Sequence, residues 1–340
     1  MTKSYRARLI SFVAMWSVVA WHCYCGSRIE KWFIPLFCYW SVPWFFLVSG
    51  FFFPDSFAKK GVLGFAISKL KSLCVPYVLW SMIGFLVFLS CSIGPVDCGF
   101  RLIFALGGSF SPAYNPPLWY IRALLIFSVI GGGALWMMCM IGIRNDCVKA
   151  AGFCFLFFML YSFLVAVGIK VGPGSSPVYF LLGVILYFLS KSQKFKWALN
   201  WAEAHALILG LTALIVAIML RSIWFSGGHS FSSTDQGGVI IGNLSSLALI
   251  IALWQLTGKM TFPVGRFLWY VGAGVFVYLM HRPLLMCFVG RVTRYMCDCD
   301  FNKDVLFGLL VVLYTPLCLL TGRCFYVLFP RAYSVLIGGR

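Results

Sequence analysis

The sequence predicts an all-α polytopic membrane protein with about ten transmembrane helices in one bundle. Of its 340 residues, 61% are hydrophobic and 11% are charged, whereas a soluble domain has about 45–50% apolar and about 25% charged residues. The mean hydropathy of +0.93 leaves too little polar surface to cover a water-soluble globule. The apolar residues also gather into runs of about 20 residues, the length of a helix that crosses a bilayer. These observations exclude a soluble enzyme, a disordered chain and a fibrous repeat.

Ten apolar runs can be marked along the chain, and we expect one helix from each. They cover residues 9–25, 33–53, 73–91, 118–143, 150–167, 174–190, 204–220, 237–256, 267–289 and 305–322. The first run follows three basic residues, as a signal peptide would, but Trp21 and His22 replace the small residues of a cleavage site, so we expect a retained helix. The sixth run is short and begins with the turn residues Gly, Ser and Pro. Neither an internal repeat nor a long linker interrupts the series, so residues 1–340 are expected to form a single membrane domain.

The distribution of lysine and arginine predicts the orientation. With a cytosolic N-terminus, 17 basic residues fall on the inner side and 8 on the outer side. Because cytosolic loops carry the excess of basic residues, both termini are expected in the cytosol, with an even number of spans. The inner set is Lys3, Arg6, Arg8, Lys59, Lys60, Lys69, Lys71, Arg144, Lys149, Lys191, Lys194, Lys196, Lys259, Arg266, Arg323, Arg331 and Arg340. The outer set is Arg28, Lys31, Arg101, Lys170, Arg221, Arg291, Arg294 and Lys303.

The net charge and the cysteines exclude two further classes of partner. The formal charge of +18 would indicate nucleic acid in a soluble protein, but here the basic residues lie between apolar runs, so we expect membrane lipids and no nucleic acid. Most of the 14 cysteines stand alone within apolar runs, where cysteine packs as a small hydrophobe. The C-x-C pairs at Cys23 and Cys297 lack the spacing of a zinc site. No metal is expected.

Four histidine and arginine residues inside the apolar runs are candidates for a site, because charge is costly there and usually marks function. They are His22, Arg122, His281 and Arg282, whereas His205 is set aside because it lies at a cytosolic span end. The expected topology gives these residues, from three separate helices, a similar depth on the outer side, and this coincidence predicts a site. Other interpretations stay open for each. Either histidine could pack as a hydrogen-bonded core residue, Arg122 could reach outward to the interface, and Arg282 could satisfy carbonyls freed by Pro283.

The chemistry of these residues favours acyl transfer over transport. No carboxylate lies in the middle of an apolar run, so a proton-coupled transporter would depend on histidine alone. Histidine is a suitable general base toward a hydroxyl group, because its ordinary pKa lies near 6.5. The sequence has no G-x-S-x-G elbow and no recognisable Cys/His nucleophile pair, which favours direct transfer without a covalent enzyme intermediate.

Five segments, in order, carry a resemblance to a known family. They are residues 18–22 (VVAWH), 43–52 (PWFFLVSGFF), 69–80 (KLKSLCVPYVLW), 117–121 (PLWYI) and 278–284 (YLMHRPL). Together they resemble the integral-membrane acyltransferase 3 family of bacteria, whose members have ten spans and O-acylate sugars of exported or cell-surface glycans. The chain departs from the family at residues 9–14, where members often carry an acidic residue and an arginine upstream of the histidine. The two alternatives are that Arg6 or Arg8 substitutes from the interface and that the chain has drifted from the family pattern.

The resemblance implies roles for several residues. His22 would be the catalytic base, and the donor would be a cytosolic acyl-CoA, most often acetyl-CoA, with no cofactor bound permanently. The topology, rather than the resemblance, places Arg122, His281 and Arg282 at a similar depth, where the two arginines are the charged candidates to stabilise an oxyanion. Lys69 and Lys71 at the inner face could attract the CoA phosphates as point charges, or could be ordinary positive-inside residues. Ser49 and Gly50 form a small pair that lets another backbone or a narrow ligand arm approach closely.

The combined interpretation is an O-acyltransferase of the bacterial inner membrane, with a glycan or lipid-linked sugar as acceptor. Two alternatives remain at this point. A small-solute or lipid-linked-sugar transporter would line a pathway with His22, Arg122 and His281. A degenerate family member would have only a binding or assembly role.

Overall fold

A computed structural model of the chain is helical throughout the part it describes, and this confirms the all-α class. The described residues are 3–23, 25–91, 104, 112, 114–143, 145–169, 171, 175–226, 236–258, 274–284, 295 and 302–339, and they include no β-strand. The helices are α1 (Lys3–His22), α2 (Glu30–Phe37), α3 (Ser41–Lys69), η1 (Leu70–Cys74), α4 (Val75–Cys91), η2 (Pro116–Leu118), α6 (Trp119–Ile141), α7 (Asp146–Ala166), α8 (Ser176–Lys191), α9 (Gln193–Ala204), α10 (Ala206–Ser226), α11 (Gln236–Thr257), α13 (Gly274–Leu284), α15 (Lys303–Leu328) and α16 (Pro330–Leu336).

Six helical segments of the described chain are long and apolar enough to cross a membrane. They are Ser41–Ser90, Pro116–Ile141, Asp146–Ala166, Ala206–Trp224, Val239–Thr257 and Lys303–Leu328, and Ser176–Lys191 is a shorter apolar helix. Each of the ten apolar runs contains helix within the described residues. The count of ten crossings stays a prediction.

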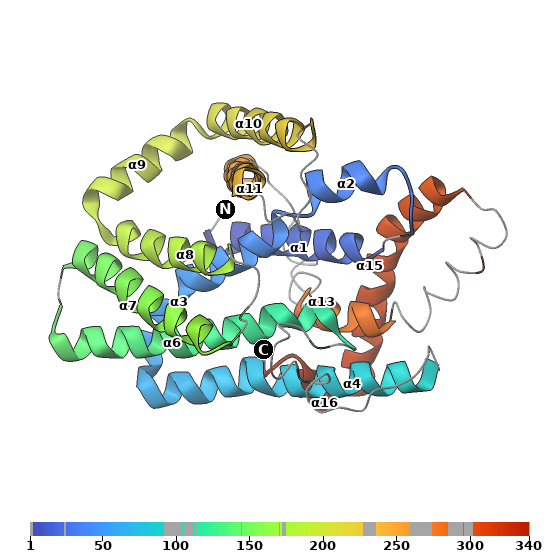
Figure 1. Cartoon of the computed structure of the whole chain (residues 1–340), viewed down its shortest axis with the longest axis horizontal. Coiled ribbons are helices and arrows are strands. Elements are labelled where there is room, and N and C mark those ends of the chain that lie inside the picture. The colour runs from blue at the N-terminus through green and yellow to red at the C-terminus, as the bar shows by residue number, and fades with distance from the viewer. Residues whose placement is uncertain are drawn as a thin grey trace.

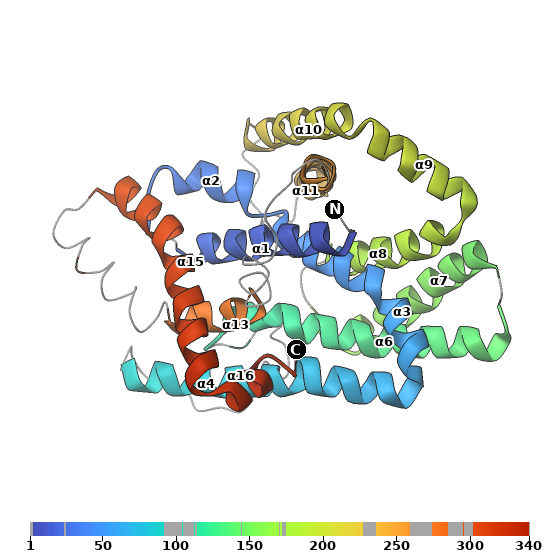
Figure 2. The same ribbon diagram turned by 180° about the vertical axis from the view of Figure 1, so that it is seen from behind.

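In the helical bundle α1, α4 and α6 run across the view, whereas α11 is seen end-on (Figure 1). The α10–α11 pair lies at one edge and α4 at the other, with α1, α3, α6 and α8 between them (Figure 1). Helix α15 crosses the direction of α1 and α6 steeply, which is also clear from behind (Figure 2). This steep crossing brings α15 against both α1 and α13.

The second and third predicted runs differ from the observed helices. Residues 33–40 are not the start of a spanning helix, because α2 ends at Phe37 and α3 begins at Ser41. Residues 54–72 are not a loop, because helix continues from Ser41 to Ser90 with a kink at Gly61. Gly61 has a φ of 65°, in the left-handed region that favours glycine. The basic residues of this segment therefore lie on helix, beside a single turn of π-helix (Leu70–Cys74).

A further helix was missed between the sixth and seventh runs. Residues 193–204 were expected as a cytosolic connection, but they form α9, which links α8 to α10 along the outside of the bundle (Figure 1). Its tryptophans Trp197 and Trp201 are 71% and 49% exposed. Amphipathic rings beside lysines are typical of a membrane–water interface, and a search for 20-residue apolar runs does not detect so short a helix.

Aromatic packing and close backbone contact hold the centre of the bundle. The rings of Phe46, Phe127 and Phe180 are fully buried, and the centroids of Phe127 and Phe180 lie 5.4 Å apart. Helices α3 and α8 approach so closely that a Cβ on Gly50 would lie 2.0 Å from the carbonyl oxygen of Phe180. A Cβ on Gly183 would likewise lie 2.1 Å from the carbonyl oxygen of Leu47. Two glycines therefore set the spacing of these helices.

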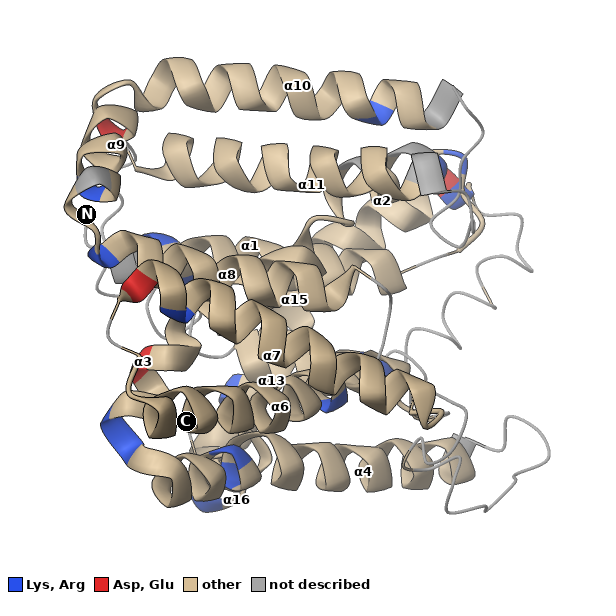
Figure 3. Cartoon of the chain, turned by 60° about the vertical axis from the view of Figure 1, so that its left-hand side comes forward, with Lys and Arg blue, Asp and Glu red and all other residues tan. Residues whose placement is uncertain are grey.

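The two termini lie toward one end of the bundle. Figure 3 shows the N and C labels near the end where α9 and the bend between α3 and α4 lie, together with several charged segments. This arrangement agrees with both termini on one side. That the side is the cytosol stays a prediction.

Candidate active site

Two of the four predicted site residues pack directly against each other. His22 is the last residue of α1, and His281 lies in the last turn of α13. Their ring centroids are 4.9 Å apart, with the ring planes at 38°. His281 is fully buried, whereas His22 is partly buried. Two histidines that are distant in the sequence therefore form one site, here called the histidine pair.

Hydrogen bonds fix the orientation of His281. Its Nδ1 lies 2.7 Å from the carbonyl oxygen of Tyr278, and a carbonyl can only accept, so Nδ1 carries the hydrogen. In the neutral ring the lone pair is then on Nε2, which is buried and has no hydrogen-bond partner among the described residues. The hydroxyl of Tyr314 on α15 donates to the backbone carbonyl of His281. A buried base with a fixed tautomer is suited to accept a proton.

The segment that carries His281 is held by an asparagine that sequence reasoning missed. Pro283 has no N–H, so it leaves the carbonyl of Leu279, four residues earlier, without its helical donor. The side-chain Nδ2 of Asn115 donates to that carbonyl at 3.4 Å and to the carbonyl of Trp80 at 3.3 Å. Asn115, rather than Arg282, therefore satisfies the freed carbonyl. A proline inside the apolar run signalled the need for a donor, but not which residue supplies it.

The two predicted arginines have different neighbours. Arg282 interacts electrostatically with His22, His281 and Tyr314, and its Nε is buried without a hydrogen-bond partner in the described chain. Arg122, in the first turns of α6, interacts electrostatically with Tyr77 of α4. Arg282 therefore interacts with both residues of the histidine pair.

A line of polar aromatic side chains connects α3 with the histidine pair. Ser49 and the hydroxyl of Tyr120 are 3.2 Å apart. The ring of Tyr120 lies 5.7 Å from that of Tyr278, and Tyr278 lies 5.9 Å from His281. The hydroxyl of Tyr278 donates to the carbonyl of Pro117 at 2.7 Å. Ser49 is therefore joined to the histidine pair through two tyrosines.

The other predicted donor-binding residues lie away from the histidine pair. Gly50 faces the backbone of Phe180, as described above, so another backbone occupies the space beside it. Lys69 is partly buried, with its Nζ 5.1 Å from the ring centroid of Phe65, and Lys71 is exposed on η1. Lys69 is the last residue of α3, and Lys71 lies within the π-helical turn that follows.

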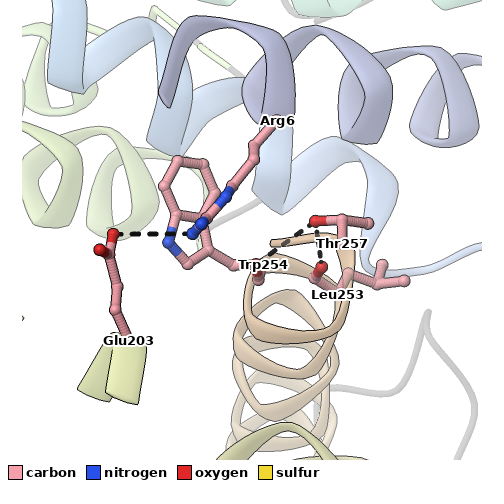
Figure 4. A network of polar contacts seen from close by, with 5 residues as sticks. All are labelled: Arg6, Glu203, Leu253, Trp254 and Thr257. Carbon is pink, nitrogen blue, oxygen red and sulfur yellow. Dashed lines mark hydrogen bonds and ion pairs between the residues drawn. The ribbon is translucent and has the colours of Figure 1, made fainter. Parts of the chain in front are cut away.

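Arg6 does not reach the histidine pair from the other end of α1. Its Nη1 lies 3.7 Å from Oε1 of Glu203 on α9, and its Cζ lies 5.7 Å from the ring centroid of Trp254 on α11 (Figure 4). Sixteen residues of helix separate it from His22, which is about 24 Å at 1.5 Å per residue. Arg6 therefore anchors the start of α1 to α9 and α11, and it does not substitute for an arginine beside the histidine.

Arg221 was expected in an outer connection but is a buried residue of α10. It is 3% exposed, and its Nη2 donates to Oγ of Ser246 on α11 at 3.0 Å. The predicted run ended at residue 220 because a charge normally ends an apolar stretch, whereas α10 continues to Ser226. Only tertiary packing reveals that this arginine faces inward.

The comparisons with known proteins give one match. A family model described as an acyltransferase domain matches residues 9–324. Neither the curated proteins nor the solved structures contain a match. Among the described residues no group of three or more histidine, cysteine, aspartate or glutamate side chains could hold a metal ion.

Proposed function

The chain belongs to the acyltransferase 3 family, and on this basis we propose that it transfers an acyl group from a cytosolic acyl-CoA to a sugar hydroxyl. The acyl group is acetyl in the simplest case, the acceptor is a surface glycan or a lipid-linked sugar, and the location is the bacterial inner membrane. The motifs that predicted the family lie within the matched residues 9–324.

One observation carries the proposal: the contact between His22 and His281 at 4.9 Å. Each residue belongs to a different motif of the family resemblance, and an acyl transfer to a hydroxyl needs a base at the acceptor oxygen. Arg282, which interacts electrostatically with His22, supplies a cation where negative charge develops on the thioester oxygen.

The reaction proceeds by direct transfer. The hydroxyl oxygen of the acceptor attacks the thioester carbonyl carbon while its proton passes to a ring nitrogen of His22. The resulting oxyanion is stabilised by the guanidinium of Arg282. Collapse of the tetrahedral intermediate breaks the carbon–sulfur bond, and the CoA thiolate takes the proton back from His22. The products are an O-acyl ester and free CoA, and no other reactant is required.

The donor enters from the side of the bundle where Lys69 and Lys71 lie. In this proposal the two lysines attract the phosphates of CoA, and the thioester arm extends past Ser49 toward the histidine pair. The Ser49–Tyr120 contact at 3.2 Å and the two tyrosine rings that follow support this route. Gly50 contributes by allowing α8 to approach α3 rather than by touching the donor.

The test is incorporation of labelled acetyl from acetyl-CoA into glycan by membranes that contain the chain. We expect label that is released by mild alkali as acetate, with one CoA thiol formed per ester. Membranes without the chain are the control. A transporter would consume no thioester and would leave no alkali-labile ester, so the absence of both would contradict the proposal. Mass spectrometry of surface polysaccharide from cells with and without the gene would locate the ester.

A further inference from the structure

Arg221 is a buried cation that the proposed reaction does not use. It is 3% exposed and lies near the end of α10. A guanidinium has five N–H donors, and the described chain gives Arg221 one hydrogen bond, to Oγ of Ser246 at 3.0 Å. The ion pairs of the described residues are formed by other side chains, so no described carboxylate compensates its charge. A charge that is buried on an apolar helix long enough to span a membrane, without a counterion among the described residues, indicates a ligand.

Two aromatic rings flank the guanidinium. Its Cζ lies 5.5 Å from the ring centroid of Tyr39 and 5.5 Å from that of Trp224. The two rings are 5.8 Å apart and nearly perpendicular. Contact with ring faces stabilises a cation without neutralising it, and it leaves the planar N–H edge free for the bidentate binding of a phosphate or carboxylate. We call Arg221, Tyr39 and Trp224 the arginine cluster.

The arginine cluster lies at the same end of the bundle as the histidine pair. The ion pair of Arg6 with Glu203 joins the start of α1 to the end of α9, immediately before α10 begins (Figure 4). Helices α1 and α10 therefore both begin near this ion pair. At their other ends, the ring of Trp21 lies 6.3 Å from that of His22 and 4.8 Å from that of Tyr39. Two ring contacts thus connect His22 with the cluster.

We propose that the arginine cluster binds an anionic group of the acceptor sugar, a phosphate or a carboxylate, while a hydroxyl of the same acceptor lies at the histidine pair. This inference rests on the proposed acyl transfer. Tyr39 is partly exposed, so the acceptor approaches the cluster from the side of this ring. The anion compensates the desolvated charge of Arg221, and the specificity of the enzyme is for acidic or phosphorylated glycan units.

The test measures binding of sugar probes to the purified full-length chain without acyl-CoA. The probes are glucuronic acid, glucose 1-phosphate and glucose, compared by ligand-observed NMR. We expect the wild type to bind the two anionic probes about tenfold or more tighter than glucose, the effect of one charge-assisted contact. Arg221→Gln should abolish the preference, and Arg221→Lys, which keeps the charge without the planar fork, should retain part of it. Arg28→Gln, which removes an exposed cation from the segment after His22, is the matched control and should change nothing.

The outcomes separate the acceptor from other sources of phosphate. Inorganic phosphate should compete weakly, because it lacks the sugar that contacts the rings, and competition equal to that of glucose 1-phosphate would overturn the proposal. The preference for anionic sugar probes is also compared between nanodiscs of phosphatidylglycerol and nanodiscs of phosphatidylcholine. Loss of this preference in phosphatidylglycerol alone would overturn the proposal, because a lipid headgroup would then occupy the arginine cluster. If Arg221→Gln fails to fold, Tyr39→Leu replaces it, and absence of any preference in the wild type refutes the inference by itself.

The same experiment distinguishes failure of this inference from failure of the proposed function. His22→Gln should keep the preference for anionic probes while its acylation activity is lost. A preference that depends on Arg221 in a protein that does not acylate would leave the anion site in place and contradict the proposed reaction. Acylation that depends on His22, without any preference for anionic probes, would contradict only the anion site.

Discussion

The rings of His22 and His281 pack against each other with centroids 4.9 Å apart, although they come from opposite ends of the chain. The contact depends on where two helices end, because His22 closes α1 and His281 lies in the last turn of α13. His281 is the buried imidazole of the pair, with its Nδ1 hydrogen-bonded to the carbonyl of Tyr278, and His22 is the partly exposed one. Substitution of each ring tests which one takes the proton.

His22→Gln should abolish acylation of the acceptor while CoA binding and the amount of protein in the membrane are retained. Glutamine keeps a hydrogen-bonding group but is far too weak a base, and loss of a general base costs about 10²–10⁴-fold in rate. The measurement is the rate of alkali-labile label formed from acetyl-CoA. If His22→Gln acylates at a near wild-type rate while His281→Gln does not, the base is His281 and His22 has a structural role.

Asn115→Asp should destabilise the protein and lower kcat more than it changes the KM for acyl-CoA. An ionised carboxylate cannot donate to the carbonyls of Leu279 and Trp80, and a buried group left without its partner costs about 1–3 kcal/mol. The kcat falls because the turn that carries His281 loses its support. Thermal unfolding in detergent and steady-state kinetics measure the two effects.

Ser128→Ala is the matched control for Asn115→Asp. Ser128 is also a buried polar residue, but its hydroxyl bonds only to the carbonyl of Leu124 one turn earlier in the same helix. We expect a smaller loss of stability and an unchanged kcat. Equal effects of the two substitutions would show that Asn115 has no special influence on the histidine pair.

The sequence was sufficient to predict the helical class, the family and the residues of the histidine pair, because each depends on local signals. Apolar runs, a histidine within a run and a proline after His281 can all be read without coordinates. The neighbours of these residues could not be predicted, since they depend on helix rotation and on kinks. The inward orientation of Arg221, the contact of Asn115 with Leu279 and the continuation of helix through Gly61 are three results of tertiary packing.

The orientation of the bundle can be tested at the Ser226–Gly238 connection, of which residues 227–235 lie outside the described residues. Ser232→Cys, in a background without other exposed cysteines, should react with an impermeant reagent in intact spheroplasts, because the excess of basic residues is expected inside. Ser192→Cys, between α8 and α9, should react only after lysis. The reverse pattern would place the termini outside, and the histidine pair would then face the cytosol.

Gly50→Ala should destabilise the protein whether or not acyl-CoA is present. Its new Cβ would lie 2.0 Å from the carbonyl oxygen of Phe180, so α3 and α8 must separate, and overpacking of this kind costs about 1–3 kcal/mol. Gly64→Ala is the control, since its Cβ would meet only the Cβ of Lys60 at 3.5 Å. Thermal unfolding should separate the two variants. A stable Gly50→Ala protein with a raised KM for acyl-CoA would return Gly50 to the donor site.

Replacement of both Lys69 and Lys71 by glutamine should raise the KM for acyl-CoA and leave folding intact. Lys71 is exposed within the π-helical turn, and Lys69 directly precedes this turn, with its Nζ 5.1 Å from the ring centroid of Phe65. Charge-assisted contacts with phosphate are worth about 1.5–3 kcal/mol each, and solvent screening reduces this for exposed groups. We therefore expect a rise in KM of about tenfold, larger at low salt, with a smaller change in kcat.

Lys59 and Lys60 provide the matched control for the donor site. They lie on the same bent helix and carry the same total charge, but Lys59 pairs with Asp55 at 2.8 Å and Lys60 donates to Ser68. Their double replacement by glutamine removes two charges from the same end of the bundle without touching the π-helical turn. If a general electrostatic attraction of the inner face were sufficient, both double variants would raise the KM equally. A specific phosphate site at Lys69 and Lys71 requires that the KM for acyl-CoA and its salt dependence change only when Lys69 and Lys71 are replaced. An unchanged KM in both would leave Lys69 and Lys71 with the topological role that basic residues have beside any cytosolic helix end.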